Sequence, residues 1–128
     1  MPKLNMVQAI NQALHEEMDR DDAVVLLGED IGPDEGVFRA TAGLHAKFGE
    51  DRVVDTPLAE SGIVGTAIGM AMAGLKPVAE IQFSGFALLA LAQLEGNASR
   101  YRSRTHGAYT VPMVVRMPYG GGVRALEH

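Results

Sequence analysis

A short, uninterrupted apolar segment near the N-terminus most constrains how this chain can fold. Residues 23–27 read Ala-Val-Val-Leu-Leu and end at Gly28, which is the pattern of a strand buried on both faces. Strands of this kind belong to parallel sheets whose two faces are covered by helices. The rest of the chain is therefore expected to supply helices between its strands.

Helical and strand-like patterns do alternate along the chain. In residues 6–20 apolar side chains recur at helical spacing, and Asn5 and Gln8 stand where an N-cap residue and its third-position partner would. Further helical patterns cover 44–48 (stopped at Gly49), 61–75 and 86–101, strand patterns cover 53–55, 77–83 and 111–117, and turn residues mark a loop at 32–36. The alternation predicts one α/β domain, a parallel sheet with helices on both faces.

The segment 61–75 would be apolar on every side of a helix, and it carries glycines at 62, 65 and 69. A helix that is apolar all round is buried, and its small residues let backbone or ligand approach closely. We therefore expect this helix at the centre of the domain.

Composition and charge exclude several classes of function. With 128 residues, 47% of them hydrophobic and 21% charged, the chain suits a single globular domain with a core. A net charge of -5 and one short basic run, at Arg100, Arg102 and Arg104, argue against a nucleic-acid partner. The chain also lacks the apolar stretch of about 18 or more residues that a membrane-spanning helix needs.

The chain contains no cysteine, and its histidines at 15, 45, 106 and 128 lack the spacing of metal ligands. The sequence therefore predicts no disulfide, no thiolate zinc site, no cysteine nucleophile and no bound metal. A reducing cytoplasm is the default location, although a chain without cysteine is compatible with any compartment.

Ligands of open α/β sheets bind beyond the carboxyl ends of the strands, which here directs attention to 28–30, 56–62, 82–86 and 119–123. Glu60 stands out, because it lies at a strand-to-helix junction between Leu58 and Ile63. Burial among apolar neighbours disfavours the charged form of a carboxylate and suits it to acid-base work. A carboxylate at a helix N-terminus that is merely stabilised by the helix dipole is the alternative, and spacing alone leaves both open.

Two further features at strand ends are weaker signals. Glycines at 120–122 follow the last apolar run, but they match no phosphate-binding motif, so a close-packed loop is favoured over a nucleotide site. Most acidic residues of the N-terminal third should be solvated charges. Glu29 and Asp30 are the exception, because they end a buried strand.

Taken together, several motifs resemble the N-terminal part of the beta subunit of the decarboxylating first component of 2-oxo acid dehydrogenase complexes. They are Leu27-Gly28-Glu29-Asp30, Gly36-Val37-Phe38-Arg39-Ala40-Thr41, Phe48-Gly49-Glu50-Asp51-Arg52-Val53, and the stretches 55–62, 79–83 and 118–122. They span nearly the whole chain, and their order and spacing make the resemblance specific. It is closest to members of the pyruvate and branched-chain types.

The resemblance implies a transketolase-like domain that binds the pyrimidine of thiamine diphosphate. In that family the glutamate matched by Glu60 hydrogen-bonds a ring nitrogen of the aminopyrimidine and so activates the cofactor for oxidative decarboxylation of a 2-oxo acid. Leu58, Gln82 and Phe86 fall where the family lines the pyrimidine pocket. A separate alpha subunit holds the diphosphate and its magnesium ion, and the implied contacts also include a second beta subunit and the acyltransferase core.

The sequence departs from the family pattern at two places. Ala92-Gln93 stands where most relatives have Asp-Gln, so the role of that carboxylate is absent or replaced. Family beta subunits also continue for about 200 residues beyond this length, and their catalytic histidine should fall just after His128. The resemblance thus describes 1–128 as a pyrimidine-binding domain incomplete at its C-terminus, and residues 126–128 fit either native chain or the remainder of a purification tag.

An incomplete domain raises a second hypothesis, that the chain alone is a non-catalytic module for folding or oligomerisation. A sheet that lacks its remaining strands would leave an edge and an apolar face open, and such surfaces promote self-association. We therefore expect dimers or larger assemblies.

Overall fold

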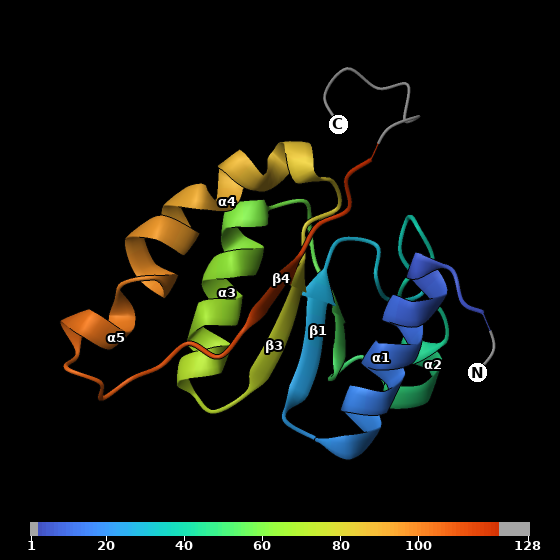
Figure 1. Ribbon diagram of the computed structural model, residues 1–128, viewed down its shortest axis with the longest axis horizontal. Helices are drawn as coiled ribbons and strands as arrows, with labels where there is room; N and C mark the ends of the chain where they lie inside the picture. The colour runs from blue at the N-terminus through green and yellow to red at the C-terminus, as the bar shows by residue number, and fades with distance from the viewer. Residues whose placement is uncertain (1–2, 121–128) are drawn as a thin grey trace.

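A four-stranded parallel sheet in the order β2-β1-β3-β4 forms the centre of the computed structural model, which describes residues 3–120 (Figure 1). Its strands are β1 (Val24–Gly28), β2 (Val53–Asp55), β3 (Lys76–Glu80) and β4 (Val114–Arg116). All three pairings are parallel, and every residue of β1 is buried. The prediction of a parallel sheet around a doubly buried strand is confirmed.

Helices α1 (Met6–Arg20) and α2 (Leu44–Phe48) cover one face of the sheet (Figure 1). Their core cluster consists of Met18, Val24, Leu26, Ile31, Leu44 and Val53. The predicted helix start is confirmed, because the Asn5 side chain accepts from the Gln8 N–H at 2.9 Å and the Gln8 side chain accepts from the Asn5 N–H at 3.0 Å. This reciprocal capping satisfies two backbone donors that the first turn would otherwise leave free.

Helices α3 (Glu60–Met72) and α4 (Ala87–Gln93) cover the opposite face (Figure 1). The sheet-facing side of α3 is buried through Ile63, Val64, Ala67, Ile68 and Ala71. Its other side, with Gly62, Thr66, Gly69 and Ala73, is exposed in the described part of the chain. The prediction of a helix buried all round is therefore right only for the sheet side, because the sheet and α4 do not surround it.

The segment predicted as one helix over 86–101 is divided into several pieces. A 3-10 turn (Ser84–Phe86) precedes α4, a π-helical turn (Leu94–Ala98) follows it, and α5 (Tyr101–Arg104) comes last. Leu94, Ala98 and Tyr101 all pack against the same core cluster, so the apolar spacing continues although the type of helix changes. Apolar spacing reports the buried side and cannot detect the change in winding.

The predicted strand 77–83 is also shorter in the structure, because β3 ends at Glu80. The backbone beyond it still follows β4: the Ile81 N–H donates to the Arg116 carbonyl at 2.9 Å and the Ser84 N–H donates to the Pro118 carbonyl at 3.0 Å. The run of apolar residues thus continues past the strand into a segment whose backbone remains fixed.

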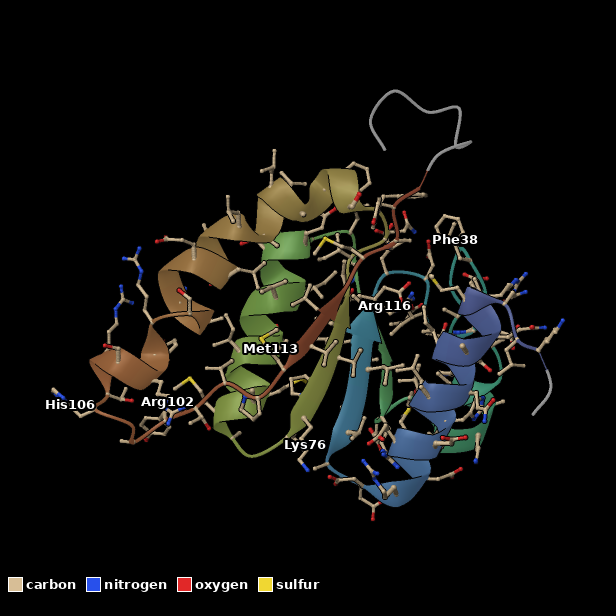
Figure 2. The ribbon with its side chains drawn as sticks, in the orientation of Figure 1. Phe38, Lys76, Arg102, His106, Met113 and Arg116 are labelled. Atoms are coloured by element: carbon tan, nitrogen blue, oxygen red, sulfur yellow. The ribbon has the colours of Figure 1, made fainter. Side chains whose placement is uncertain are left out.

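β4 pairs only with β3 within the described residues, and it borders an apolar groove. The groove has a volume of about 580 Å³ and is lined by Ile10 and Leu14 of α1 and by Val78, Met113 and Val114 of the strand side. Figure 2 shows Met113 and Arg116 along this strand, with Lys76 at the start of β3. Val114 is 56% exposed, so an apolar side chain stands on an open strand edge.

This edge should promote self-association, because unpaired strand groups beside apolar surface form a template for another chain. We expect dimers or larger assemblies in multi-angle light scattering, and a shift toward monomer in Val114→Lys, since a charged edge residue opposes strand pairing. Val37→Lys, at a loop residue that is 47% exposed, is the matched control and should leave the mass unchanged. A wild-type protein that stays monomeric at all concentrations would contradict the expectation.

Candidate functional site

Acidic residues gather beyond the carboxyl ends of β1 and β2. Glu29 and Asp30 follow β1, Asp55 is the last residue of β2, and Glu60 is the first residue of α3. Because β1 lies between β2 and β3 in the sheet, the turn after β1 is adjacent to the loops that follow both neighbours. The strand order thus makes the β1 turn the centre of this edge.

Glu60 is buried, with 6% of its surface exposed. It occupies the first turn of α3, where the preceding residue Ala59 provides no side-chain cap, so the carboxylate lies at the positively polarised end of the helix. Within residues 3–120 the carboxylate has no hydrogen bond or ion pair with another protein group. The residue is buried, but its carboxylate oxygens still reach the surface, where solvent or a ligand can hydrogen-bond them.

The pKa of Glu29 shows that these carboxylates lie close enough to influence one another. Burial raises the pKa of Glu29 above its ordinary value, and the negative charges of Asp30, Glu60 and Asp55 raise it further. One of those carboxylates is also engaged elsewhere, because Asp55 Oδ1 accepts from the Gly32 N–H at 3.2 Å. The sequence prediction that Glu29 and Asp30 differ from the solvated acidic residues agrees with this environment.

Gln82 follows β3 and is joined to the β1 turn by a hydrogen bond. Its Nε2 donates to Asp30 Oδ2 at 2.9 Å. Asp30 adopts a left-handed backbone conformation with φ 57°, which is uncommon outside glycine and best tolerated by Asp and Asn. The structure thus brings Gln82 to the same edge as the acidic residues.

The other two predicted site residues, Phe86 and Leu58, differ in how much of their surface is packed against the protein. Phe86 ends the 3-10 turn and packs edge-on against Phe83 with ring centroids 6.1 Å apart, and it also contacts the core cluster on the α3 face. Leu58, between β2 and α3, is 65% exposed. Leu58 therefore has surface available to a ligand, whereas Phe86 already contributes to packing.

Gly28 allows the closest approach of backbone at this edge. A Cβ atom at this position would lie 2.9 Å from both the Cβ and the carbonyl oxygen of Glu80, which no real side chain tolerates. A larger residue would therefore push β1 away from β3.

Glu80 forms a buried ion pair that the sequence pattern did not predict. The pattern indicated only that Glu80 and Gln82 are polar residues on one face of a strand. Glu80 is 7% exposed and pairs with Arg116, its register partner on β4. Burial raises the pKa of Glu80, and the Arg116 charge offsets part of that rise. The polar residues at 80 and 82 indicated that one face of the strand is polar. The partner of Glu80 could be identified only from the register of β3 against β4.

An unpartnered hydroxyl and a contact from α4 lie near the start of α3. The Thr56 hydroxyl is buried and has no hydrogen-bond partner among the described residues, beside a cavity of about 230 Å³ under the start of α3. On α4, Ala92 is exposed, and Gln93 Nε2 donates to Ser61 Oγ at 3.4 Å. The departure from the family pattern at Ala92-Gln93 therefore lies beside the first turn of α3.

The predicted glycine run begins at Gly120, the last described residue. Gly120 is exposed, with nothing within 4 Å of the position a Cβ would take, and the rest of the glycine run at 121–122 lies outside the described residues. Within residues 3–120, no group of three or more His, Cys, Asp and Glu side chains could hold a metal ion. In the same range no helix is both long and apolar enough to cross a membrane.

The fold is a doubly wound α/β domain, and at the carboxyl ends of its strands it carries the carboxylate of Glu60, which has no protein partner among the described residues. The family described as transketolase, pyrimidine binding domain matches residues 2–128, and the chain belongs to this family. This membership confirms the fold class that the sequence motifs implied.

Curated relatives extend the comparison. The chain is 56% identical over 128 residues to the pyruvate dehydrogenase E1 component subunit beta of Acholeplasma laidlawii. It is 52% identical over 129 residues to the 2-oxoisovalerate dehydrogenase subunit beta of Bacillus subtilis. Each match covers 100% of this chain and 39% of the relative. The predicted resemblance to these beta subunits is confirmed, and the chain spans about two fifths of their length.

Glu29→Gln tests the repulsion among the acidic residues. A carboxyl whose pKa is raised by folding favours the fold below its ordinary pKa and loses that contribution as pH rises through the folded value. Ionised Glu29 should therefore destabilise the protein near neutral pH. We expect Glu29→Gln to raise the free energy of unfolding at about pH 7 by less than about 1 kcal/mol, because solvent screens the site, and to change it little at about pH 4.

Urea unfolding at both pH values measures the effect. Glu50→Gln, at an exposed residue, is the control and should change stability equally little at both. An effect of Glu29→Gln that is larger at the lower pH would contradict the assignment.

Proposed function

We propose that the chain is the pyrimidine-binding domain of the beta subunit of a thiamine diphosphate-dependent 2-oxo acid dehydrogenase, and that Glu60 activates the cofactor. The observation that carries the proposal is the position of Glu60, a buried residue beyond the carboxyl ends of the strands whose carboxylate has no protein partner among the described residues. Membership of the pyrimidine-binding family supports the ligand class, and the names of the relatives support the enzyme class.

The residues at this edge fit the aminopyrimidine half of the cofactor. A ring nitrogen can hydrogen-bond the Glu60 carboxyl, and a dry environment strengthens that bond. Leu58 supplies an apolar wall, Gln82 an amide, and Phe86 an aromatic edge. The orphaned Thr56 hydroxyl is a further polar group in this region that a ligand or an ordered water could satisfy.

Glu60 acts by holding a hydrogen bond and a proton at the pyrimidine ring. Its place in the first turn of α3 stabilises its negative charge. When bound, thiamine diphosphate would supply a carbon acid whose conjugate base can add to a carbonyl, and a ring that can take up the electron pair released with carbon dioxide. The protein contributes the position of the pyrimidine ring and the carboxyl group that holds the proton.

The proposal makes this domain one half of a composite site. A separate alpha subunit would hold the diphosphate and its magnesium ion, a second beta subunit would complete the assembly, and the acyltransferase core would receive the acyl group. The substrate would be pyruvate or a branched-chain 2-oxo acid, because the relatives include beta subunits of both types. The enzyme would operate in the cytoplasm.

A second candidate function is a non-catalytic module for folding or oligomerisation. It is favoured by the open edge at β4, where exposed Val114 borders an apolar groove. It predicts no cofactor binding by the isolated chain in calorimetry. Tight binding of thiamine diphosphate without any partner would exclude it.

Replacement of Glu60 tests the main proposal. In a protein assembled with its alpha subunit, magnesium and thiamine diphosphate, Glu60→Gln and Glu60→Ala should lower the rate of 2-oxo acid decarboxylation by about 100-fold or more, as loss of an acid-base group does. Glu60→Gln keeps the size of the side chain and so separates loss of the carboxyl from loss of packing.

The measurement is the steady-state release of carbon dioxide, with Glu50→Gln as the control that retains activity. Unchanged turnover in both Glu60 variants would defeat the assignment of Glu60.

A further inference from the structure

The first turn of α3 carries Glu60 but lacks the usual support of a helix start. Ala59, the residue before it, has no side chain that could accept a hydrogen bond from the free N–H groups of this turn. Between Glu60 and the next buried residue, Ile63, the helix exposes Ser61 and Gly62. The position of this turn therefore depends on contacts from outside α3.

Such a contact comes from α4, which lies beside the start of α3 (Figure 1). Gln93, the last residue of α4, donates from Nε2 to Ser61 Oγ at 3.4 Å. The same side chain lies over Gly65, because a Cβ atom placed on Gly65 would be 3.6 Å from Gln93 Cδ. Ser61 and Gly65 are one helical turn apart, so the Gln93 amide spans the first turn of α3 and contacts it at both ends.

The Gln93 amide is itself oriented by Asn97. Asn97 Nδ2 donates to Gln93 Oε1 at 2.7 Å, in a partly buried position. A glutamine amide whose oxygen is occupied in this way has its NH2 group left to face Ser61. Asn97 belongs to the π-helical turn Leu94–Ala98, and π-helical turns are rare and are found frequently at functional sites. The irregular turn therefore supplies the group that orients the Gln93 amide.

We propose that Gln93 is a positioning residue that replaces the missing side-chain cap of α3 and so fixes the carboxylate of Glu60, with Asn97 orienting its amide. This inference rests on the proposed function, in which Glu60 activates the cofactor, and deepens it by naming residues of another helix that act through Glu60. A displacement of a reacting group by about 1 Å can cost about 100-fold in rate. A contact that holds the turn of Glu60 in place is therefore expected to affect turnover.

Gln93→Met tests this contact in the protein assembled with its alpha subunit, magnesium and thiamine diphosphate. Methionine keeps the length of the side chain and its packing over Gly65, but it cannot donate to Ser61. We expect kcat, measured as carbon dioxide release at saturating 2-oxo acid, to fall by about tenfold. An unchanged kcat would overturn the proposal.

Asn97→Ala should also lower kcat, by less than Gln93→Met does, because it frees the Gln93 amide to turn without removing it. No loss of rate in Asn97→Ala would overturn its orienting role. Ser99→Ala is the matched control and should retain the wild-type kcat. It removes a hydrogen bond that follows the same π-helical turn, from Ser99 Oγ to the Glu95 carbonyl at 2.7 Å, and that bond does not involve α3.

A double variant distinguishes positioning of Glu60 from general damage. If Gln93 acts through Glu60, then Gln93→Met in a Glu60→Gln background should lower the residual kcat by less than about twofold, since the effects of residues that depend on each other do not add. A merely structural role would lower kcat by about the same factor in both backgrounds. That result would overturn the proposal.

A new helix cap should replace the lost contact. The Cβ of Ala59 is 3.5 Å from the position that a Cβ atom would take on Gly62, so a hydroxyl at residue 59 would lie near the Gly62 N–H, where an N-cap side chain bonds. We expect Ala59→Ser to restore most of the kcat lost in Gln93→Met. Hydrogen exchange of residues 59–64 in the assembled protein gives a readout that is independent of turnover. Exchange should be faster in Gln93→Met and return toward the wild-type rate in the double variant, and an exchange rate that Gln93→Met leaves unchanged would contradict the capping role.

The outcomes separate the two proposals. If Glu60→Gln decarboxylates as fast as the wild type, the assignment of Glu60 fails and this inference fails with it. If Glu60→Gln loses activity while Gln93→Met keeps the wild-type kcat and hydrogen exchange, only the positioning role of Gln93 is overturned.

Discussion

The parallel pairing of β1 with both β2 and β3 is the constraint on which the rest of the structure depends. β1 is buried along its whole length, so helices must cover both of its faces, and its parallel neighbours bring three carboxyl ends to one edge. The turn after β1 then contacts the loops that follow β2 and β3. The site is a consequence of this arrangement, because no single loop contains all of its residues.

Burial of polar groups at this edge is balanced by specific partners. Buried Glu80 is paired with Arg116, half-buried Gln82 bonds to Asp30, and exposed Asp55 accepts from the Gly32 N–H. Buried polar groups are costly unless they are satisfied in this way. The carboxylate of Glu60 and the buried hydroxyl of Thr56 differ from them, since among the described residues neither has a hydrogen-bond partner, and both can therefore bond a ligand or water.

The two faces of the domain differ in how completely they are covered. α1 and α2 close the face over β1 and β2, whereas the groove beside β3 and β4 and the exposed side of α3 remain open. Open apolar surfaces of this kind are suited to contact with another chain. The domain thus combines a sheet edge held by specific hydrogen bonds and an ion pair with apolar surfaces that its own helices leave open.

The sequence by itself determined the features that depend on local chemistry. The capping pair of Asn5 and Gln8, the buried strand before Gly28, and the helix stop at Gly49 were all predictable, because each rests on neighbouring residues. The motifs also led to the family and to Glu60 as a candidate. Apolar spacing extended β3 too far and predicted one helix where the type of helix changes, since it marks the buried side and not the hydrogen bonding of the backbone.

Only the tertiary structure decided which polar groups meet. The Glu80–Arg116 pair follows from the register of β3 against β4, and the bond from Gln82 to Asp30 follows from the adjacency of β1 and β3. The residues of each pair are far apart in the chain, and each alone reads as an ordinary polar residue near a strand end. Strand order and register are set by the packing of the whole domain, and this is why the sequence could indicate the edge but not the contacts within it.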